Sequence, residues 1–211
     1  FPFFVTLHLL GGMMLLVFLT IQLVKQRHTF EKTSSIPLPV WAYVITALTW
    51  ISVFIQTGLG AWVSSNYAVL ACDTYPMCQN SWWPDMNMDK AFELWRSLGL
   101  DAEGQPLPFQ ALTAIHMVHR WHAVLPALLL LLVAAGWFQA GLKNPARLLS
   151  ALLFLQFATG ISNAVLGWPM SAALLHTGSA AALLLVLTWT LASTRPRRST
   201  HIAATFNRHM L

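Results

Sequence analysis

Five long apolar segments restrict the folds that are open to this chain. They cover residues 3–24, 39–63, 110–138, 147–167 and 170–193. Each supplies about the 20 residues that a helix needs to cross a hydrocarbon layer ~30 Å thick. The segments are continuously apolar and lack the alternation of apolar and polar residues found in barrel strands, so they predict helices.

The composition is that of a membrane protein. Hydrophobic residues make up 56% of the chain and charged residues only 9%, whereas soluble domains carry about 25% charged residues. The net charge of +5 does not come from a basic stripe interleaved with aromatic residues, so it does not indicate a nucleic-acid partner. We therefore expect an all-α, polytopic membrane helix bundle with five transmembrane helices in a lipid bilayer.

The basic residues indicate how these helices are oriented. Nine of the twelve follow the first segment, separate the third from the fourth, or follow the fifth: Lys25, Arg27, Lys32, Lys143, Arg147, Arg195, Arg197, Arg198 and Arg208. The opposite side holds a loop over residues 64–109 that is rich in acidic side chains. The positive-inside rule then predicts an amino terminus outside and a carboxyl terminus in the cytoplasm.

The start of the chain is unusual for a membrane protein. Phe1 and Pro2 lie almost inside the first apolar segment. An odd number of spans, an outside amino terminus and no visible signal segment together predict a further amino-terminal portion before Phe1. A targeting segment cleaved just before Phe1 is the alternative.

Two histidines within the apolar segments are the main candidates for chemistry. His119 lies roughly 14 Å below Gln110, and His176 lies roughly 10 Å into the last helix. Both helices enter from the outer side, and two imidazoles at matched depth suit a six-coordinate heme. We therefore expect His119 and His176 to ligate one heme, although a buried histidine can also be structural. His116 and His122 share roughly the face of His119, and either could replace it.

Arg120 directly follows His119 within the same apolar segment. An arginine at membrane depth is costly and needs an anionic partner. Heme propionates would supply one, because arginine binds carboxylates through two parallel hydrogen bonds. The alternative is that the side chain extends outward to the interface.

Cys72 and Cys78 both lie in the outer loop. An outer compartment permits disulfides, so we expect these two residues to be joined. A redox-active pair or a metal site is the alternative, but the spacing is not C-x-x-C and no nearby histidine completes a zinc set. The loop is also rich in aromatic residues, which favour the membrane interface. We expect it to cap the bundle, with a short surface helix at residues 87–98.

The first and last apolar segments begin in a similar way. Each has a proline, several mostly apolar residues, a Leu-His pair and then small residues, in the runs 2–12 and 169–178. His8 thereby matches His176, but no second histidine is apparent for it. We expect His8 to belong to a second heme pocket whose other ligand lies outside this chain. An interface histidine near a helix end is the alternative.

At these residues the chain resembles the heme A synthase family, the membrane enzymes that oxidise heme O for cytochrome oxidase. The similarity covers nearly the whole chain in the family's order. It rests on four segments: residues 5–12, residues 59–63 running on to both cysteines, residues 116–123, and residues 156–169 followed by His176.

The resemblance implies eight spans in two four-helix halves, each half with a pair of histidines. Residues 1–35 would hold the last helix of the amino-terminal half and a cytoplasmic linker. Residues 36–211 would form the carboxyl-terminal, heme-binding half. His119 and His176 would ligate heme b, and His8 would be catalytic in the pocket where heme O reacts.

The chain departs from the family pattern at two places. The family's acidic residue three positions before the amino-terminal His-Arg pair is not present, and His116 holds the equivalent place in the second copy. Ser64 stands where an arginine often follows the Gly-x-x-Val motif. The chain would therefore contain the cofactor half and only part of the catalytic pocket.

The resemblance implies a heme A synthase of the bacterial inner membrane that converts the C8 methyl of heme O to a formyl group. Heme O synthase and cytochrome oxidase assembly factors would be its partners. A b-type cytochrome that only transfers electrons is one alternative, and a non-catalytic heme-handling assembly protein is another. A second heme pocket containing a carboxylate would favour the enzyme.

Overall fold

The computed structural model describes residues 1–31 and 35–197 of the chain. Within these ranges, five helices are long and apolar enough to cross a membrane. They are α1 (Pro2–Glu31), α2 (Val40–Ser65), α4 (Phe109–Gln139), α5 (Lys143–Val165) and α6 (Met170–Ser193). The predicted all-α membrane bundle is confirmed. Lys32, Arg198 and Arg208 of the predicted basic clusters lie outside the described residues.

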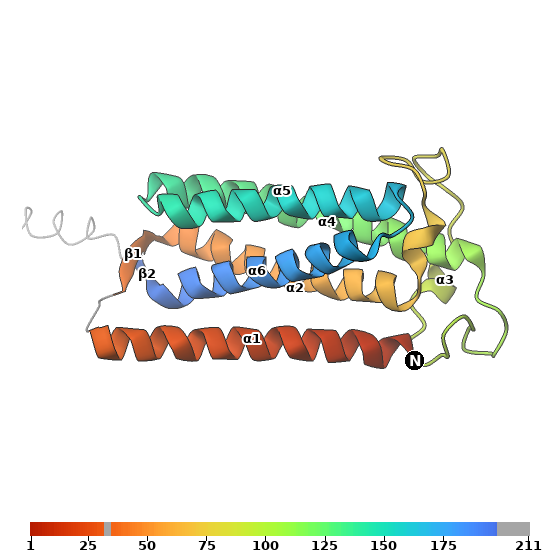
Figure 1. Cartoon of the computed structure of the whole chain (residues 1–211), viewed down its shortest axis with the longest axis horizontal. Coiled ribbons are helices and arrows are strands. Elements are labelled where there is room, and N and C mark those ends of the chain that lie inside the picture. The colour runs from red at the N-terminus through yellow and green to blue at the C-terminus, as the bar shows by residue number, and fades with distance from the viewer. Residues whose placement is uncertain (32–34, 198–211) are drawn as a thin grey trace, which may run out of the picture.

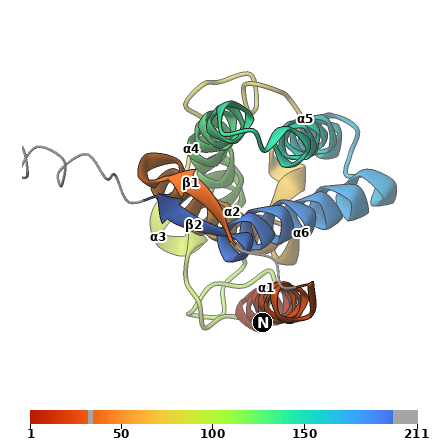
Figure 2. The same cartoon turned by 90° about the vertical axis from the view of Figure 1, so that its left-hand side faces the viewer.

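The five helices run side by side along the long axis of the molecule (Figure 1). The start of α1 and the loop between α2 and α4 lie at one end, and the ends of α1 and α6 lie at the other. Helices α2, α4, α5 and α6 form a four-helix bundle, while α1 packs outside it against α2 and α6 (Figure 2). The alternating helix directions are those predicted, and the side that faces the cytoplasm stays a prediction.

Two of the helices differ in length from the predicted spans. Helix α1 continues through a polar segment to Glu31. The contact of Arg27 Nε with the Glu31 carboxylate, at 2.9 Å, joins residues four apart in its last turns. Helix α5 starts at Lys143 and ends at Val165. Gly167 follows with a φ of 68°, a left-handed conformation that glycine adopts at little cost. This turn lets the chain reverse directly into α6.

A two-stranded parallel sheet closes the end opposite the loop, and the sequence did not predict it. Strand β1 (Ile36–Pro39) pairs with β2 (Thr194–Arg197). The two segments meet because β1 leads into α2 and β2 continues from α6 at the same end of the bundle. Pro37, Pro39 and Pro196 lack an N–H to donate, which keeps this sheet short.

The end of the bundle nearest the strands has a well-filled core. Trp137 and Leu187 are fully buried there. The indole N–H of Trp137 on α4 donates to Thr46 Oγ1 on α2 at 3.0 Å. A β-carbon at Gly136 would lie 2.7 Å from the Trp41 ring, so this glycine permits the close approach of α2 and α4. The tight packing fixes the spacing of the helices that carry the histidines.

The outer loop folds over the other end of the bundle, as predicted for a cap. It contains a short 3-10 helix, η1 (Ala68–Ala71), and a single helical turn, α3 (Met88–Ala91). The surface helix expected at residues 87–98 is thus shorter than predicted. The Asn87 side chain caps it by accepting from the Lys90 N–H at 3.0 Å, and the helix ends at Phe92.

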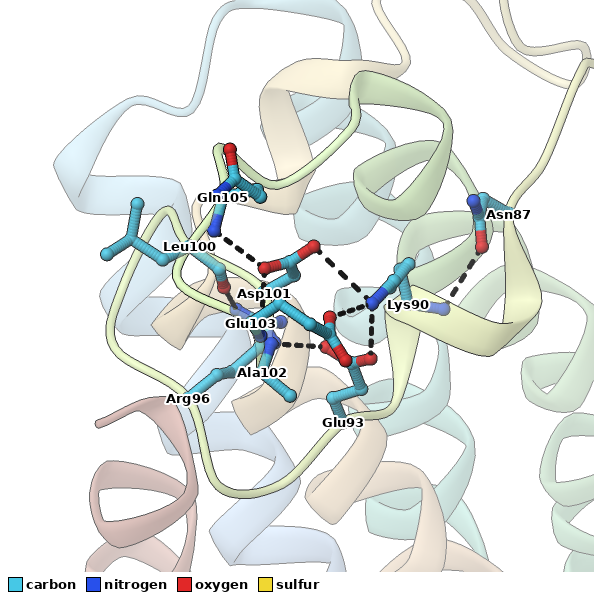
Figure 3. Close-up of polar contacts among 9 residues, drawn as sticks. All are labelled: Asn87, Lys90, Glu93, Arg96, Leu100, Asp101, Ala102, Glu103 and Gln105. Carbon is cyan, nitrogen blue, oxygen red and sulfur yellow. Dashed lines mark hydrogen bonds and ion pairs between the residues drawn. The ribbon is translucent and has the colours of Figure 1, made fainter.

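The loop is held by a network of charges around Lys90, which explains why α3 does not continue (Figure 3). The Lys90 ammonium contacts the carboxylates of Glu93 at 3.0 Å and Asp101 at 3.4 Å, and it also pairs with Glu103. These contacts need residues 101–103 to fold back over α3. Arg96 is almost fully buried beneath the network and donates to Asn66 Oδ1 at 2.6 Å, which joins the loop to the end of α2.

Candidate functional site

A cavity of about 400 Å³ lies between α2, α4, α5 and α6, at the end of the bundle covered by the outer loop. His119 on α4 and His176 on α6 both line it. The other lining residues are mostly apolar, and they include Val69 and Tyr75 of the loop. Its volume is within the range of about 300–1,000 Å³ typical of ligand and cofactor pockets. The structure thus brings together the two histidines that the sequence paired.

The His176 ring rests against α5 at a glycine. A β-carbon on Gly160 would lie 3.2 Å from His176 Cε1, so any larger residue here would require the ring to move by a few tenths of an ångström. Gln156, one turn earlier, donates through Nε2 to the backbone carbonyl of His176 at 2.9 Å and to Ser179 Oγ at 2.8 Å. The side chain of Thr159 lies 3.0 Å from His176 Nδ1.

The His119 ring rests against α2 in the same way. A β-carbon on Gly60 would lie 3.1 Å from His119 Cε1. Gln56, one turn earlier, donates through Nε2 to the His119 carbonyl at 3.0 Å. The same nitrogen lies 3.0 Å from His119 Nδ1.

Each histidine therefore packs against a glutamine and a glycine that lie four residues apart on the preceding helix of the bundle. The pairs are Gln56–Gly60 and Gln156–Gly160. Residues four apart share one face of a helix, so each pair presents an amide and an open surface to the same histidine. We missed this feature in the sequence, although two Gln-x-x-x-Gly runs in apolar segments were a visible signal.

The two histidines beside His119 occupy different surroundings. His122 Nδ1 hydrogen-bonds to Gln56 Oε1 at 2.7 Å, and His122 does not line the cavity. His116 does line the cavity and is only 5% exposed, and its Nε2 accepts from Arg120 Nε at 3.1 Å. Position on the cavity favours His119 over His122 as a ligand. The choice of ligand stays a prediction.

Arg120 reaches toward the outer loop. Its guanidinium donates to the backbone carbonyls of Thr74 at 2.9 Å, Met77 at 3.1 Å and Cys72 at 3.3 Å. These carbonyls satisfy the donors of the guanidinium and attach the loop to the helix that carries His119. Arg120 also lines the cavity, so its contact with a propionate stays a prediction.

The predicted disulfide is present. Cys72 and Cys78 are joined, and both are fully buried. They pack against Met117 and Trp121 of α4. The bridge therefore fixes the loop segment whose carbonyls receive Arg120, which gives it a structural place in the cap.

The structure does not bring His8 to the other two histidines. His8 is exposed on α1, whereas its neighbour Leu9 is the residue of α1 that lines the cavity. His8 therefore does not compete for the site of His119 and His176. Its assignment to a second pocket stays a prediction.

The donor set of the cavity suits a metal held by a macrocycle. Across residues 1–31 and 35–197, no group of three or more His, Cys, Asp or Glu side chains could hold a metal ion. His116, His119 and His176 all line the cavity, so an iron held there by two of these imidazoles would take its other ligands from another molecule. A porphyrin does this, leaving two axial positions for histidines.

Comparison with known proteins identifies the family. The sequence pattern of the COX15-CtaA family, described as "Cytochrome oxidase assembly protein", matches residues 1–188. The chain belongs to this family. The resemblance to heme A synthases that the motifs indicated is thereby confirmed.

Two relatives of this COX15-CtaA chain are named heme A synthase. The protein of Shewanella oneidensis is 37% identical over 190 residues, which cover 88% of this chain and 56% of the relative. The protein of Rhizorhabdus wittichii is 26% identical over 182 residues, which cover 86% of this chain and 49% of the relative. The chain thus spans about half the length of the curated relatives it matches.

The residues of this COX15-CtaA chain fit a heme. The absence of a β-carbon at Gly60 and Gly160 lets the rings of His119 and His176 pack directly on the neighbouring helices, where both residues line the cavity. The apolar lining would cover a macrocycle, and Arg120 offers a cation at the outer end of the cavity.

Proposed function

We propose that this chain is the heme b-binding part of a heme A synthase, with His119 and His176 as the axial ligands. The observation that carries the proposal is that both histidines line one cavity in a chain that belongs to this family. The relatives named heme A synthase are about twice as long as the matched region, so the activity is proposed for the whole protein.

The proposed reaction converts the C8 methyl of heme O to a formyl group by successive hydroxylations, for cytochrome oxidase biogenesis. When bound, heme b would supply electron transfer. The chain's own residues hold and orient this group: Gly60 and Gly160 leave room for the imidazoles, and Gln56 and Gln156 fix the backbone that carries them. The cavity lining is mostly apolar and would cover the faces of the group.

We further propose that His8 is catalytic in a separate pocket that receives heme O. Its exposed position on α1, outside the four-helix bundle, supports this proposal. Residues 1–35 would then belong to the amino-terminal half of the protein and residues 36–211 to the half that holds heme b.

The proposed location is the bacterial inner membrane, with the outer loop outside the cell and the carboxyl terminus in the cytoplasm. The placement of Lys25, Arg27, Lys143, Arg147 and Arg195 at the end opposite the loop supports this orientation. Heme O synthase and cytochrome oxidase assembly factors are the proposed partners, because they supply the substrate and use the product.

Pigment analysis tests the proposal. The full-length protein is expressed with a heme O synthase in cells that lack heme A, and the extracted hemes are separated by chromatography. Heme A should accumulate, and the purified protein should show a low-spin heme b spectrum that His119→Ala or His176→Ala abolishes.

The control is His122→Ala, because His122 does not line the cavity. It should leave the low-spin spectrum unchanged. An unchanged spectrum in both the His119 and His176 variants would refute the proposed ligands. A normal heme b spectrum without heme A would instead identify an electron-transfer cytochrome.

A further inference from the structure

Thr159 on α5 has a contact with His176 that the proposed ligand role does not by itself explain. Thr159 is 6% exposed, and its Oγ1 lies 3.0 Å from His176 Nδ1. The same hydroxyl lies 2.6 Å from the backbone carbonyl oxygen of Leu155 and 3.3 Å from that of Gln156. A threonine hydroxyl has one hydrogen to donate and two lone pairs to accept with, so these contacts restrict one another.

The shortest of the three contacts locates the hydroxyl hydrogen. The separation of 2.6 Å between Thr159 Oγ1 and the Leu155 oxygen falls within the O–H···O range of about 2.5–3.0 Å. A carbonyl oxygen cannot donate, so the hydrogen on this contact is that of Thr159. The carbonyl of Gln156 at 3.3 Å is a second, weaker acceptor for the same hydrogen. Thr159 can then only accept from His176.

The hydrogen on this last contact must therefore come from His176 Nδ1. A neutral imidazole carries one N–H, and the other ring nitrogen keeps its lone pair. With Nδ1 protonated, the lone pair is on Nε2. The hydrogen bonds of the described residues include none to this Nε2, and His176 lines the cavity. The backbone of Gln156 also lies close to the His176 ring.

We propose that Thr159 is a positioning residue that holds His176 in the tautomer with hydrogen on Nδ1, so that Nε2 is ready to bind iron. This inference rests on the proposed function for the identity of the metal. Hydrogen bonds to the outer nitrogen of a metal-bound histidine fix its tautomer and increase its basicity. Thr159 and Gly160 act on one ring: the hydroxyl fixes its proton, and the glycine leaves space for its edge.

Helix α2, which packs against His119, has no hydroxyl at the position equivalent to Thr159. Leu59 precedes Gly60 on α2, where Thr159 precedes Gly160 on α5. His119 Nδ1 faces the Nε2 amide nitrogen of Gln56 at 3.0 Å instead, and this nitrogen is a donor. The two proposed ligands are therefore unequal, and His176 is the one whose surroundings favour binding through Nε2.

The first test measures the tautomer directly in protein free of heme. Nitrogen NMR of ¹⁵N-histidine-labelled protein distinguishes protonated from unprotonated ring nitrogens, and His176→Gln identifies the signals of this residue. At a pH above about 8, where histidine is neutral, His176 should be protonated on Nδ1. Thr159→Val removes the acceptor and should shift the population toward the Nε2–H form, while Thr159→Ser should restore the original pattern.

Thr190→Val is the matched control. Thr190 is 4% exposed, and its hydroxyl donates to the carbonyl four residues earlier, Val186, at 2.9 Å, but it does not line the cavity. This variant should leave the His176 signals unchanged. Thr159→Ala serves as a second test if valine disturbs the packing. A wild-type His176 protonated on Nε2, or a tautomer that neither the Val nor the Ala variant alters, would overturn the inference.

The second test uses the heme-loaded protein and measures its midpoint potential. A less basic ligand stabilises the ferric state less, so Thr159→Val should shift the potential to a more positive value. Thr159→Ser and Thr190→Val should stay near the wild type. Equal potentials in all four proteins would contradict a role toward the iron. If His176 is not a heme ligand at all, a different result reveals it: the low-spin spectrum survives in His176→Ala.

Discussion

At the scale of single residues, the site depends on positions that lack a side chain as much as on those that have one. The histidines could be selected from the sequence because an imidazole in an apolar segment is unusual. Gly60 and Gly160 could not be selected in the same way, because glycines are common in membrane helices and most serve close helix packing. Their role depends on how neighbouring helices are rotated, which only the structure specifies.

Substitution of the glycines gives the first prediction. Gly160→Ala would place a β-carbon 3.2 Å from His176 Cε1, and Gly60→Ala would place one 3.1 Å from His119 Cε1. Each ring must then move away from its helix. We expect both variants to lose most of the low-spin heme b absorbance, as measured in purified protein at equal protein concentration.

Gly178→Ala is the control for this prediction. Gly178 lies two residues beyond His176 on α6, and a β-carbon there would meet nothing within 4 Å. Alanine favours a helix over glycine by about 1 kcal/mol, so this variant should keep its heme and unfold no more readily than the wild type. Normal heme content in Gly60→Ala and Gly160→Ala would show that heme binding does not require the rings to pack closely on these glycines.

At the scale of the elements, the spans and the disulfide were predictable because each depends on local sequence. The apolar segments are long enough to be recognised as membrane spans from length alone, and Cys72 and Cys78 lie in one loop. The sheet of β1 and β2 and the contacts of Arg120 were not predictable, because they join segments far apart in the chain. Arg120 finds backbone carbonyls of the outer loop, a partner with no sequence signature.

The charge network of the outer loop gives an element-scale prediction of pH dependence. Hydrogen bonding to Lys90 lowers the pKa of Glu93. Desolvation opposes ionisation of Asp101, but the Gln105 N–H and the Lys90 ammonium hold the pKa of Asp101 below its usual value. A carboxyl whose pKa is lowered on folding stabilises the fold above its unfolded pKa, and this contribution is lost as pH falls through the folded value.

The loop should therefore loosen below about pH 4, where carboxyl groups become protonated. The carboxylate of Glu103 is the main cause that raises the pKa of Lys90, so the lysine stays charged throughout this range. The protection of the amides in residues 87–105, measured as their exchange rate relative to the intrinsic rate at the same pH, should fall between pH 5 and pH 3. In Lys90→Met the exchange should be faster already at neutral pH and less dependent on acid. A loop equally protected at both pH values would contradict this role of the network.

At the scale of the whole molecule, α1 is an additional helix beside a four-helix bundle that already contains both proposed heme ligands. It packs against α2 and α6, and it contributes Leu9 to the cavity. His8, the next residue, is exposed. The sequence predicted this separation of His8 from the other pair, because the repeat at residues 2–12 and 169–178 placed it at the start of a different helix.

This separation leads to a prediction about His8. His8 is exposed and does not line the cavity, so His8→Ala should leave the heme b spectrum and the fold unchanged. If His8 acts on heme O, the same variant should abolish heme A formation by the full-length protein. Pigment chromatography from cells that also make heme O measures the second effect, and absorbance of the purified protein measures the first.

His28→Ala is the matched control, because it makes the same change near the other end of α1. It should leave both heme A yield and the heme b spectrum unchanged. Loss of heme b in His8→Ala would place His8 in the first site, against its exposed position. A normal heme A yield from His8→Ala would instead remove it from the catalytic pocket, because an imidazole that performs chemistry on heme O cannot be replaced by a methyl group without loss of rate. His8 would then be a histidine of the membrane interface, and the catalytic group would have to be sought outside α1.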